Sequence, residues 1–342
     1  MVGNTLVIVG SGPVGMTAAL ALQDRFERVV LLERQSKERF LRTKGFTFPI
    51  VLSPATIDVL QQVDAWEAIH AERSPYYGVV VHKRLLGRHL SWTAKRAGVY
   101  SHWRHHIVAS LYERVVACGI EVVFDADVHA IDFSENLVEE KTLGAIPFDL
   151  LLGADGINSI TRRLMAEAHP DHRNDEFTST LMDRWYAYRL PSEGAVAERF
   201  DGGDKHHAAH VHVDDAAQYP ADKFRLITVA MKQPRDEISI VAKHGADLSL
   251  ERLRAINDTF FAPLVDADVL DREWNQGVGG KYEHVEAPTF HLNSALLIGD
   301  AAHGFEGNGD LINLGICSVG SLVGIVEQHP GVEQALAAYD RS

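Results

Sequence analysis

The sequence predicts an α/β fold in which a domain built on a parallel sheet is interrupted by a second, mainly antiparallel β-sheet domain. Three observations predict this arrangement. The chain opens with an apolar strand, a glycine-rich turn and a helix; residues of about 170–290 alternate apolar and polar side chains; and α/β patterning returns from residue 295. We therefore place the first domain at residues 1–170 and 286–342 and the second at residues 171–285.

The first half of the chain contains the elements of a parallel sheet with helices between its strands. Residues 5–9 form a short apolar run rich in β-branched side chains, which predicts a buried strand, and small residues in the helix expected at 12–22 allow a close approach to the sheet. Ser53 is the predicted N-cap of a helix that continues to about residue 63. Further strands are expected at residues 28–32, 120–124, 128–133 and 149–152, and further helices at 105–118 and 159–166.

The later segments separate the inserted sheet from the returning α/β part. Alternation predicts antiparallel strands at residues 208–213, 224–231 and 238–242, and a helix is expected at 249–257. A strand at 295–298 and helices at 313–326 and 332–339 then complete the first domain.

Composition and charge exclude several classes of protein. The 342 residues carry a formal net charge of -14, and so acidic a chain repels nucleic acid and anionic membrane surfaces, so we expect no nucleic-acid partner. Two cysteines make neither a disulfide framework nor a zinc site. We expect no metal, because zinc needs three or four converging ligands and the histidines at His206, His207, His210 and His212 have no obvious partner in the other elements.

The apolar N-terminal stretch is not interpreted as a targeting signal. No basic residue precedes residues 6–22, and glycines and a proline interrupt them. We find no apolar run of the roughly 18 residues that a membrane-spanning helix needs. The expectation is a soluble cytoplasmic protein without stable membrane insertion.

The turn after the first strand has the pattern GxGxxG between a strand and a helix, which is typical of a dinucleotide-binding site. Gly10 makes the tight turn, Gly12 lets the backbone approach a pyrophosphate, and Gly15 lets the helix pack on the strand. Glu33 closes the second strand, where a carboxylate can accept both ribose hydroxyls. An acid at this position favours FAD or NAD over NADP.

Two later segments resemble motifs of a known family. Residues 153–162, Gly-Ala-Asp-Gly-Ile-Asn-Ser-Ile-Thr-Arg, resemble the "DG" motif GADGxxSxxR of class A flavoprotein monooxygenases, the para-hydroxybenzoate-hydroxylase class. Residues 295–303, which contain Gly299 and Asp300, resemble the "GD" motif of the same class. The resemblance implies a Rossmann-like FAD-binding domain of the GR2 type, interrupted by a substrate domain.

The resemblance also implies a set of FAD contacts. Asp300, at the end of a strand, is suited to accept the ribityl hydroxyls; Asp155 holds the loop between flavin and nicotinamide; and Arg162 holds that loop through a carboxylate or carbonyls. Arg104 lies where the family has an arginine near the FAD ribose and pyrophosphate. The expected cofactor-binding residues are Gly10, Ser11, Gly12, Pro13, Val14, Gly15, Glu33, Arg34, Arg104, Val128, Asp155, Gly299, Asp300, Leu311, Ile312 and Asn313.

The activity implied by the class is hydroxylation of a small aromatic substrate with NAD(P)H and O₂ through a flavin C4a-hydroperoxide. The layout is most similar to the kynurenine 3-monooxygenase group, in which an arginine like Arg88 binds the substrate carboxylate. Tyr100, His210 and His303 are the other expected substrate residues, and no general base stands out, so that no catalytic residue is assigned.

The segment after Gly299 departs from the family pattern. Gly307 stands for a proline, Asp310 lies in the GQG region, Ser318 replaces an acid, and the segment is one residue shorter. A carboxylate near the N1–C2 end of the flavin would disfavour the anionic reduced form. Two alternatives therefore stay open: a flavoprotein of this fold with other redox chemistry, such as a reductase or N-hydroxylase, or a non-catalytic protein that binds flavin or another ligand.

Overall fold

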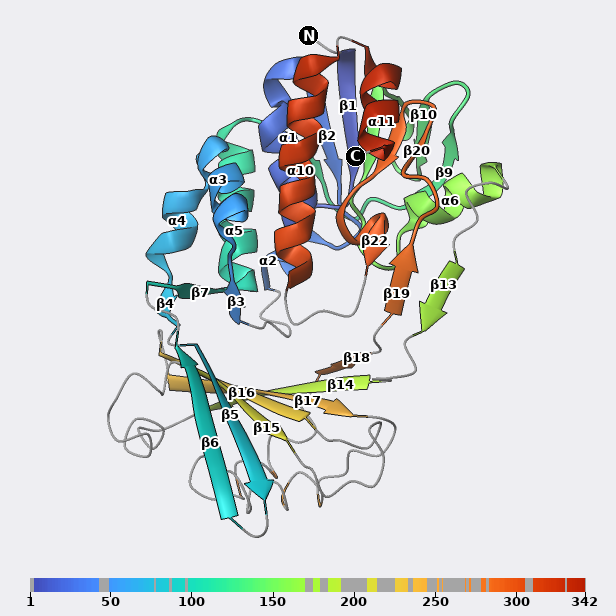
Figure 1. Ribbon diagram of the computed structural model, residues 1–342. Helices are drawn as coiled ribbons and strands as arrows, with labels where there is room; N and C mark the ends of the chain where they lie inside the picture. The colour runs from blue at the N-terminus through green and yellow to red at the C-terminus, as the bar shows by residue number, and fades with distance from the viewer. Residues whose placement is uncertain are drawn as a thin grey trace.

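The computed structural model has an α/β body and a separate β-sheet layer below it (Figure 1). It describes residues 3–42, 49–76, 78–85, 88–95, 98–169, 175–178, 184–191, 208–213, 225–232, 236–244, 278–280, 283–304, 310–329 and 331–341, with single residues 251, 254, 268 and 271.

The α/β body is built on a six-stranded sheet in the order β20-β21-β12-β1-β2-β8. All neighbours are parallel except the β20–β21 pair. The carboxyl ends of β1, β12 and β21 therefore meet at one edge, and each is followed by one of the three motifs. The bounds are β1 Gly3–Val9, β2 Phe26–Leu32, β8 Glu121–Val123, β12 Leu150–Gly153, β20 His291–Leu292 and β21 Ala295–Leu297.

Strand side chains alternate between two cores. Leu6 and Ile8 of β1 face a core shared with the helices, while Val7 and Val9 face a second core on the other side of the sheet. This alternation is the period of a strand that is buried on both faces.

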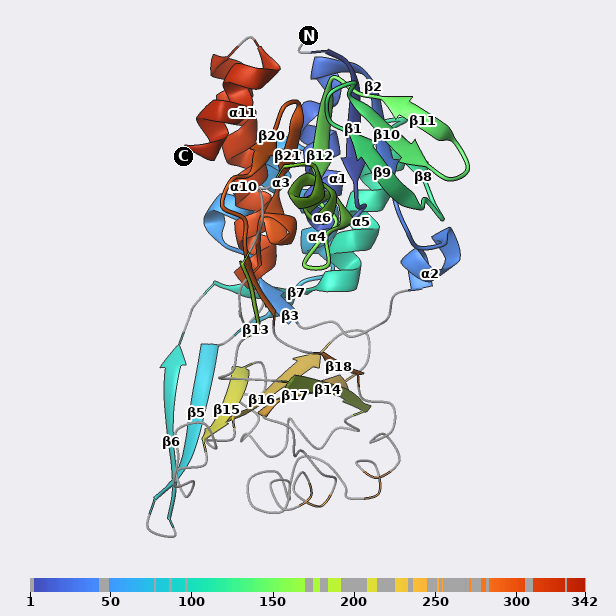
Figure 2. The same ribbon diagram turned by 90° about the vertical axis from the view of Figure 1, so that its right-hand side faces the viewer.

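Helices cover one face of the six-stranded sheet. Helix α1 packs against α5 and α10, and α10 also packs against α3 and α11. On the other face lie α6 and a three-stranded sheet in the order β11-β10-β9 (Figure 2). The bounds are α1 Pro13–Leu22, α2 Lys37–Arg42, α3 Pro54–Gln62, α4 Trp66–Ala71, α5 Arg104–Ala117, α6 Ile160–Ala168, α10 Asp310–Gln328, α11 Val332–Asp340, β9 Val128–Asp132, β10 Leu137–Glu140 and β11 Gly144–Pro147.

The second layer is a seven-stranded sheet in the order β18-β14-β17-β16-β15-β5-β6. Every pair is antiparallel except β15 with β5, which confirms a mainly antiparallel sheet. The bounds are β5 Gly78–Leu85, β6 Arg88–Lys95, β14 Arg184–Pro191, β15 Ala208–Val213, β16 Arg225–Lys232, β17 Asp236–His244 and β18 Val278–Gly280.

The hairpin of β5 and β6 belongs to the second sheet, although the expected domain division places it in the first domain. The sequence division assigns residues 78–95 to the first domain, but β5 pairs with β15 and β6 pairs with β5, so both strands are part of the second sheet. The physical reason is that strand pairing is decided by a partner about 130 residues later, which local alternation does not reveal.

Two small sheets connect the layers. Strands β13 Asp175–Thr178 and β19 Glu283–Glu286 pair where the chain leaves and re-enters the α/β body, and β19 also pairs with β22 His303–Gly304 (Figure 1). Strands β3 Pro49–Val51, β7 Tyr100–Trp103 and β4 Ser74–Pro75 form the other connection.

Most of the expected elements are present within a few residues of their bounds. Ser53 is a true N-cap, since its Oγ accepts a hydrogen bond from Thr56 N. The expected helix at 249–257 lies outside the described residues except for Glu251 and Arg254, which are helical. The small strands β3, β4, β10 and β11 were not expected, because each has only two to four residues.

One helix among the described residues is long and apolar enough to cross a membrane by length and composition alone, whereas the sequence analysis found no apolar run of that length. Within α10, Leu311–Gln328 has 18 residues and a mean hydropathy of 1.5, with 28% of the segment buried. Ile316, Val319, Leu322 and Val326 of this helix lie in the core shared with α1 and the sheet. The helix itself was expected at residues 313–326, but it was not counted as a long apolar run, and Gly315, Gly320 and Gly324 interrupt its apolar pattern.

Candidate cofactor-binding site

The glycine turn has the geometry that its sequence predicts. Gly10 has φ +100°, and its N–H donates to Leu32 O at 2.8 Å. A Cβ on Gly10 would lie 2.5 Å from Ala154 O, and one on Gly15 would overlap Gly10 O. Only glycine therefore lets strand, turn and helix pack so closely.

Gly12 is different, because a Cβ at this position would have no atom within 4 Å. Its backbone is extended, with φ -68°, so alanine would fit the conformation. Gly12 precedes Pro13 at the start of α1 and lines a cavity. The open space in front of this helix N-terminus is where unpaired N–H groups and the helix dipole favour a phosphate.

This cavity has a volume of about 390 Å³ and runs along the carboxyl edge of the sheet. It brings together residues from five separate parts of the sequence. The expected cofactor residues that line it are Gly10, Gly12, Glu33, Arg34, Arg104, Val128 and Asp155.

Glu33 is fixed beside the glycine turn. Its side chain is buried, with Oε2 accepting a hydrogen bond from Ser11 N at 3.1 Å and Oε1 accepting one from Gln35 N at 2.8 Å. A carboxylate has further lone pairs, so these bonds orient Glu33 and leave it able to accept ribose hydroxyls.

The loop after β12 is held by Asp155. Its Oδ1 accepts the Ser159 hydroxyl at 2.5 Å, and its Oδ2 accepts Thr161 N at 3.0 Å and Thr161 Oγ1 at 3.1 Å. Asp155 thus stabilises the start of α6 and lines the cavity at the same time.

Arg162 joins two of the motifs. This buried arginine donates to Ile157 O at 2.7 Å and to Ala301 O at 3.0 Å. The first carbonyl belongs to the loop after β12 and the second to the loop after β21. The expectation that Arg162 holds the loop through carbonyls is confirmed.

Asp300 and Arg104 are the charged pair of the site. Desolvation raises the pKa of the Asp300 carboxyl and the nearby Arg104 charge opposes this shift; desolvation likewise lowers the pKa of Arg104, against the attraction of Asp300. Arg104 lines the cavity, and Asp300 is half-buried after Gly299, whose φ is +60°. Opposite charges here can bind both an anion and a hydroxyl-rich chain.

Asn313 has a role that sequence patterns did not show. Its Oδ1 accepts hydrogen bonds from Ser53 N and Thr56 Oγ1, each at 2.8 Å, and its Nδ2 donates to Val51 O at 2.9 Å. The side chain joins α10 to the β3–α3 connection, so what remains for a cofactor is the backbone of this turn. Leu311 and Ile312, the neighbouring expected contacts, lie in the same first turn of α10.

Val14 packs the start of α1 against the loop after β21 and against α10. A Cβ on Gly299 or on Gly315 would meet the Val14 side chain, at 3.1 Å and 2.5 Å respectively. Ser318, which replaces the family's acid, donates to Gly315 O at 2.7 Å. Gly307 lies outside the described residues, and so does the side chain of Asp310.

The expected substrate residues lie in three places. Arg88 begins β6 and His210 is in β15, and the side chains of both are outside the described part of the chain. Tyr100 lies in β7, its ring 5.2 Å from that of His70. His303 lies in β22, where desolvation lowers its pKa, and among the described residues its Nε2 has no hydrogen-bond partner.

No group of three or more His, Cys, Asp or Glu residues converges within the described residues in a way that could hold a metal ion. The side chains of the histidine cluster at 206–212 are not among those residues.

A face of α5 was not among the expected site residues. His105, Val108 and Ala109 line the cavity beside Arg104. Val108 lies four residues after Arg104, which is the spacing of one helix face and was the available signal. Ala126, Asp127 and Arg163 also line the cavity, and no local pattern marks them.

A histidine pair lies beside the site and predicts a pH dependence of stability. His70 Nδ1 and His102 Nε2 are 3.4 Å apart, and Trp66 stacks on His70 at 4.5 Å. Desolvation, followed by the His70 charge, lowers the pKa of His102 from 6.5 to about 4. The unfolded chain therefore takes up a proton at a pH at which folded His102 does not, and stability falls as pH decreases from about 6.5 to about 4.

Replacing His102 with glutamine is expected to remove this loss. Between pH 7.5 and 5 the wild-type protein should lose about 2 kcal/mol more unfolding free energy than the variant. Urea denaturation at both pH values measures the difference, and equal losses in the two proteins would contradict the assignment.

These features define a dinucleotide-binding flavoprotein site. Three loops meet at one edge of the sheet, open space lies before the N-terminus of α1, and the Glu33 carboxylate is fixed at the end of the next strand. The chain matches the FAD binding domain family over residues 4–323, and it belongs to that family. FAD is therefore its cofactor, and the open space at Gly12 together with the Glu33 carboxylate fits the FAD pyrophosphate and ribose.

Relatives and solved structures agree with this assignment. Kynurenine 3-monooxygenase of Phaeosphaeria nodorum is 23% identical over 364 residues, which cover 98% of this chain and 73% of the relative. The structure of 2-methyl-3-hydroxypyridine-5-carboxylic acid oxygenase superposes with a TM-score of 0.78 at 18% identity, covering 99% of this chain and 86% of that one. PqsL of P. aeruginosa, solved with 2-aminobenzoylacetate, has a TM-score of 0.72 at 17% identity, covering 99% and 91%. The fold is thus that of the para-hydroxybenzoate-hydroxylase class.

Proposed function

We propose that this protein is a FAD-dependent monooxygenase that hydroxylates a small aromatic substrate with NAD(P)H and O₂. The observation that carries the proposal is the convergence of the glycine turn, the Asp155 loop and the Asp300 loop at one edge of the sheet, above a second, antiparallel sheet (Figure 1). Relatives with names of aromatic monooxygenases cover almost the whole chain, which supports the same chemistry here.

FAD supplies the redox chemistry of this reaction, and the protein supplies binding, orientation and a dry site. The first turn of α1 and Gly12 hold the pyrophosphate, and Glu33 accepts the ribose hydroxyls. Asp300 accepts hydroxyls of the ribityl chain, and Arg104 compensates its charge. Asp155 and Arg162 hold the loops after β12 and β21, which would lie next to the flavin.

The substrate is proposed to be an aromatic carboxylic acid. The names of two structural neighbours contain a carboxylic acid and an acetate on a ring compound, and kynurenine is the substrate named for the sequence relatives. Arg88 is the proposed partner of the carboxylate, because a guanidinium can bind it with two hydrogen bonds. Tyr100, His210 and His303 complete the proposed substrate residues.

A cytoplasmic location is part of the proposal. Cys118 and Cys317 are both unpaired thiols, which agrees with a reducing compartment. No finding favours the alternatives of a reductase, an N-hydroxylase or a non-catalytic binding protein.

The proposal is tested with purified protein, first by its visible flavin spectrum and then by NAD(P)H oxidation with a panel of aromatic acids. We expect a yellow protein in which some aromatic acids accelerate NAD(P)H oxidation and yield a product with one added oxygen atom. Stimulated oxidation without hydroxylated product would contradict the monooxygenase assignment but not FAD binding.

The role of Arg88 is tested in the same assay. Arg88→Met should raise the KM for the preferred acid by roughly 30-fold or more, since a charge-assisted pair contributes about 2 kcal/mol or more. Its FAD content should not change. Arg84→Met, in the neighbouring strand, is the matched control, and an equal effect of both variants would argue against a specific contact.

A further inference from the structure

Glu140 is a buried carboxylate at a strand position where an apolar side chain is expected. Along β10 the side chains alternate, with Val138 and Glu140 buried and Glu139 exposed, and Glu140 is only 1% exposed. Burial of an unpaired charge is strongly unfavourable, so the surroundings of this carboxylate must compensate it.

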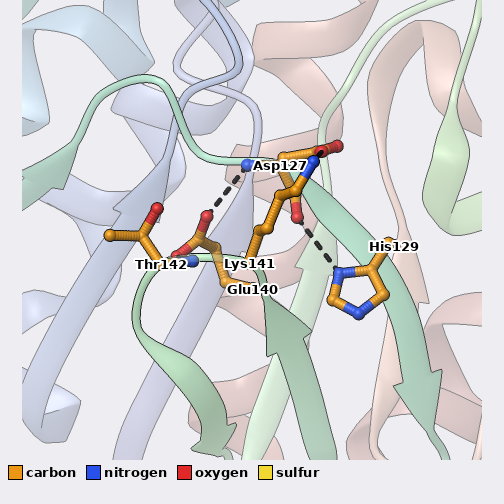
Figure 3. Close-up of polar contacts among 5 residues, drawn as sticks. All are labelled: Asp127, His129, Glu140, Lys141 and Thr142. Atoms are coloured by element: carbon orange, nitrogen blue, oxygen red, sulfur yellow. Dashed lines mark hydrogen bonds and ion pairs between the residues drawn. The ribbon is translucent and has the colours of Figure 1, made fainter.

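The compensation comes from backbone N–H groups. Glu140 Oε2 accepts hydrogen bonds from Thr142 N at 2.9 Å and Leu143 N at 2.7 Å. Its Oε1 accepts one from Asp127 N at 3.1 Å (Figure 3). Desolvation raises the pKa of Glu140, but these N–H groups lower it by more, and the carboxyl group has a pKa below its usual range. Glu140 is therefore an ionised acceptor.

The bond to Asp127 reaches the cofactor cavity. Residues 126–128 form one wall of that cavity, and Glu33 and Arg34 line it from the neighbouring loop. Two backbone N–H groups of this wall make hydrogen bonds that hold it in place. Ala126 N donates to Glu33 O at 2.9 Å, and Asp127 N donates to Glu140. Glu140 itself does not line the cavity.

Glu33 lies between the glycine turn and this wall, because Ser11 N donates to Glu33 Oε2 and Ala126 N donates to Glu33 O. The glycine turn takes the pyrophosphate and Glu33 takes the ribose, so the wall beyond Glu33 lies at the adenine end. We propose that Glu140 is a positioning residue for the adenine end of the FAD site: its carboxylate holds residues 126–128 in the conformation that receives the adenosine half of the cofactor.

This inference rests on FAD binding and not on the proposed oxygenation, so the two can fail separately. ADP contains the adenosine diphosphate half of FAD without its flavin, and it is therefore the probe for this end of the site. Binding of ADP and FAD to the apoprotein can be measured by calorimetry and by flavin fluorescence, without any turnover.

The variant is Glu140→Gln. Glutamine keeps the shape of the glutamate side chain but replaces one acceptor oxygen by an NH₂ group, which then faces a backbone N–H group and cannot accept its hydrogen bond. We expect the dissociation constants of both FAD and ADP to rise by the same factor, about tenfold, which is the usual effect of losing one such bond. The visible spectrum of the FAD-saturated variant should equal that of the wild-type protein.

The matched control is Glu139→Gln. Glu139 is the neighbouring acid, but it is exposed, and its ion pair within the described residues is with exposed His129 at 3.5 Å. An exposed pair of this kind contributes little, so this variant should bind FAD and ADP as the wild-type protein does. Circular dichroism confirms that each apoprotein is folded at the titration temperature.

A second variant covers the case in which Glu140→Gln does not fold. Glu140→Asp keeps the charge but is one methylene too short to reach both Asp127 and the Thr142–Leu143 turn, and it should show a smaller but equal loss for FAD and ADP. The proposal is overturned if folded Glu140 variants bind both ligands within twofold of wild type, or if they lose FAD but keep ADP affinity.

Discussion

Replacing Gly12 with alanine is expected to lower the affinity for FAD at least tenfold while the apoprotein stays folded. The added Cβ meets no protein atom within 4 Å and the backbone of Gly12 is extended, so the fold is not strained. The methyl group occupies the space in front of α1 where the pyrophosphate must approach the backbone. Fluorescence titration of the apoprotein with FAD, together with thermal unfolding of the apoprotein, measures the two effects.

Two other glycines are the controls for this prediction. Gly15→Ala should destabilise the apoprotein itself, because its Cβ overlaps Gly10 O, which is backbone and cannot move aside. Gly324→Ala in α10 also has no atom within 4 Å but lies away from the cavity, and it should bind FAD normally and gain up to about 1 kcal/mol of stability. Normal FAD binding by the Gly12 variant would show that the pyrophosphate lies elsewhere.

Replacing Arg162 with methionine is expected to cost about 2–4 kcal/mol of unfolding free energy and to weaken FAD binding. Arg162 is 4% exposed and donates to two carbonyls, Ile157 O and Ala301 O, and without it both are left without these charged donors. The loops after β12 and β21 would then lose the side chain that connects them. Urea denaturation and FAD titration measure these losses.

Arg28→Met is the matched control. Arg28 also makes two hydrogen bonds, to Glu121 at 3.2 Å and 2.9 Å, but both side chains are about half exposed. Its loss should cost less than about 1 kcal/mol and leave FAD affinity unchanged. If the two variants were equally stable, the bridge between the loops would have no structural importance.

The local chemistry of the site could be predicted because it depends on residues close together in sequence. The turn at residues 10–15 follows from the steric need for glycine, and the position of Glu33 follows from the length of one strand, one helix and the next strand. The N-cap at Ser53 and the capping of α6 are likewise contacts within six residues. Such contacts have a sequence signature that does not depend on the rest of the fold.

Other features depend on contacts between distant segments. The pairing of β5 with β15, the bond from Arg162 to Ala301 O and the three bonds of the Asn313 side chain each join residues separated by more than 100 positions. Glu140 lies only 13 residues from Asp127, but the hydrogen bond between them joins the end of β10 to the residue before β9, and no local pattern predicts it. Local alternation says which face a side chain takes but not what lies opposite it.

The sequence by itself determined the class of cofactor and the α/β arrangement. The glycine turn and the carboxylate that closes the next strand occur at a short, fixed spacing, and few local structures fit that spacing. Only the tertiary structure decided which loops share the cavity and how each is held there. It shows that Arg162 and Asn313 join elements, that α5 lines the cavity, and that Glu140 accepts a hydrogen bond from Asp127 in the cavity wall. The physical reason is that a buried polar group must find its partners wherever the packed chain supplies them, and that choice is made across the whole fold.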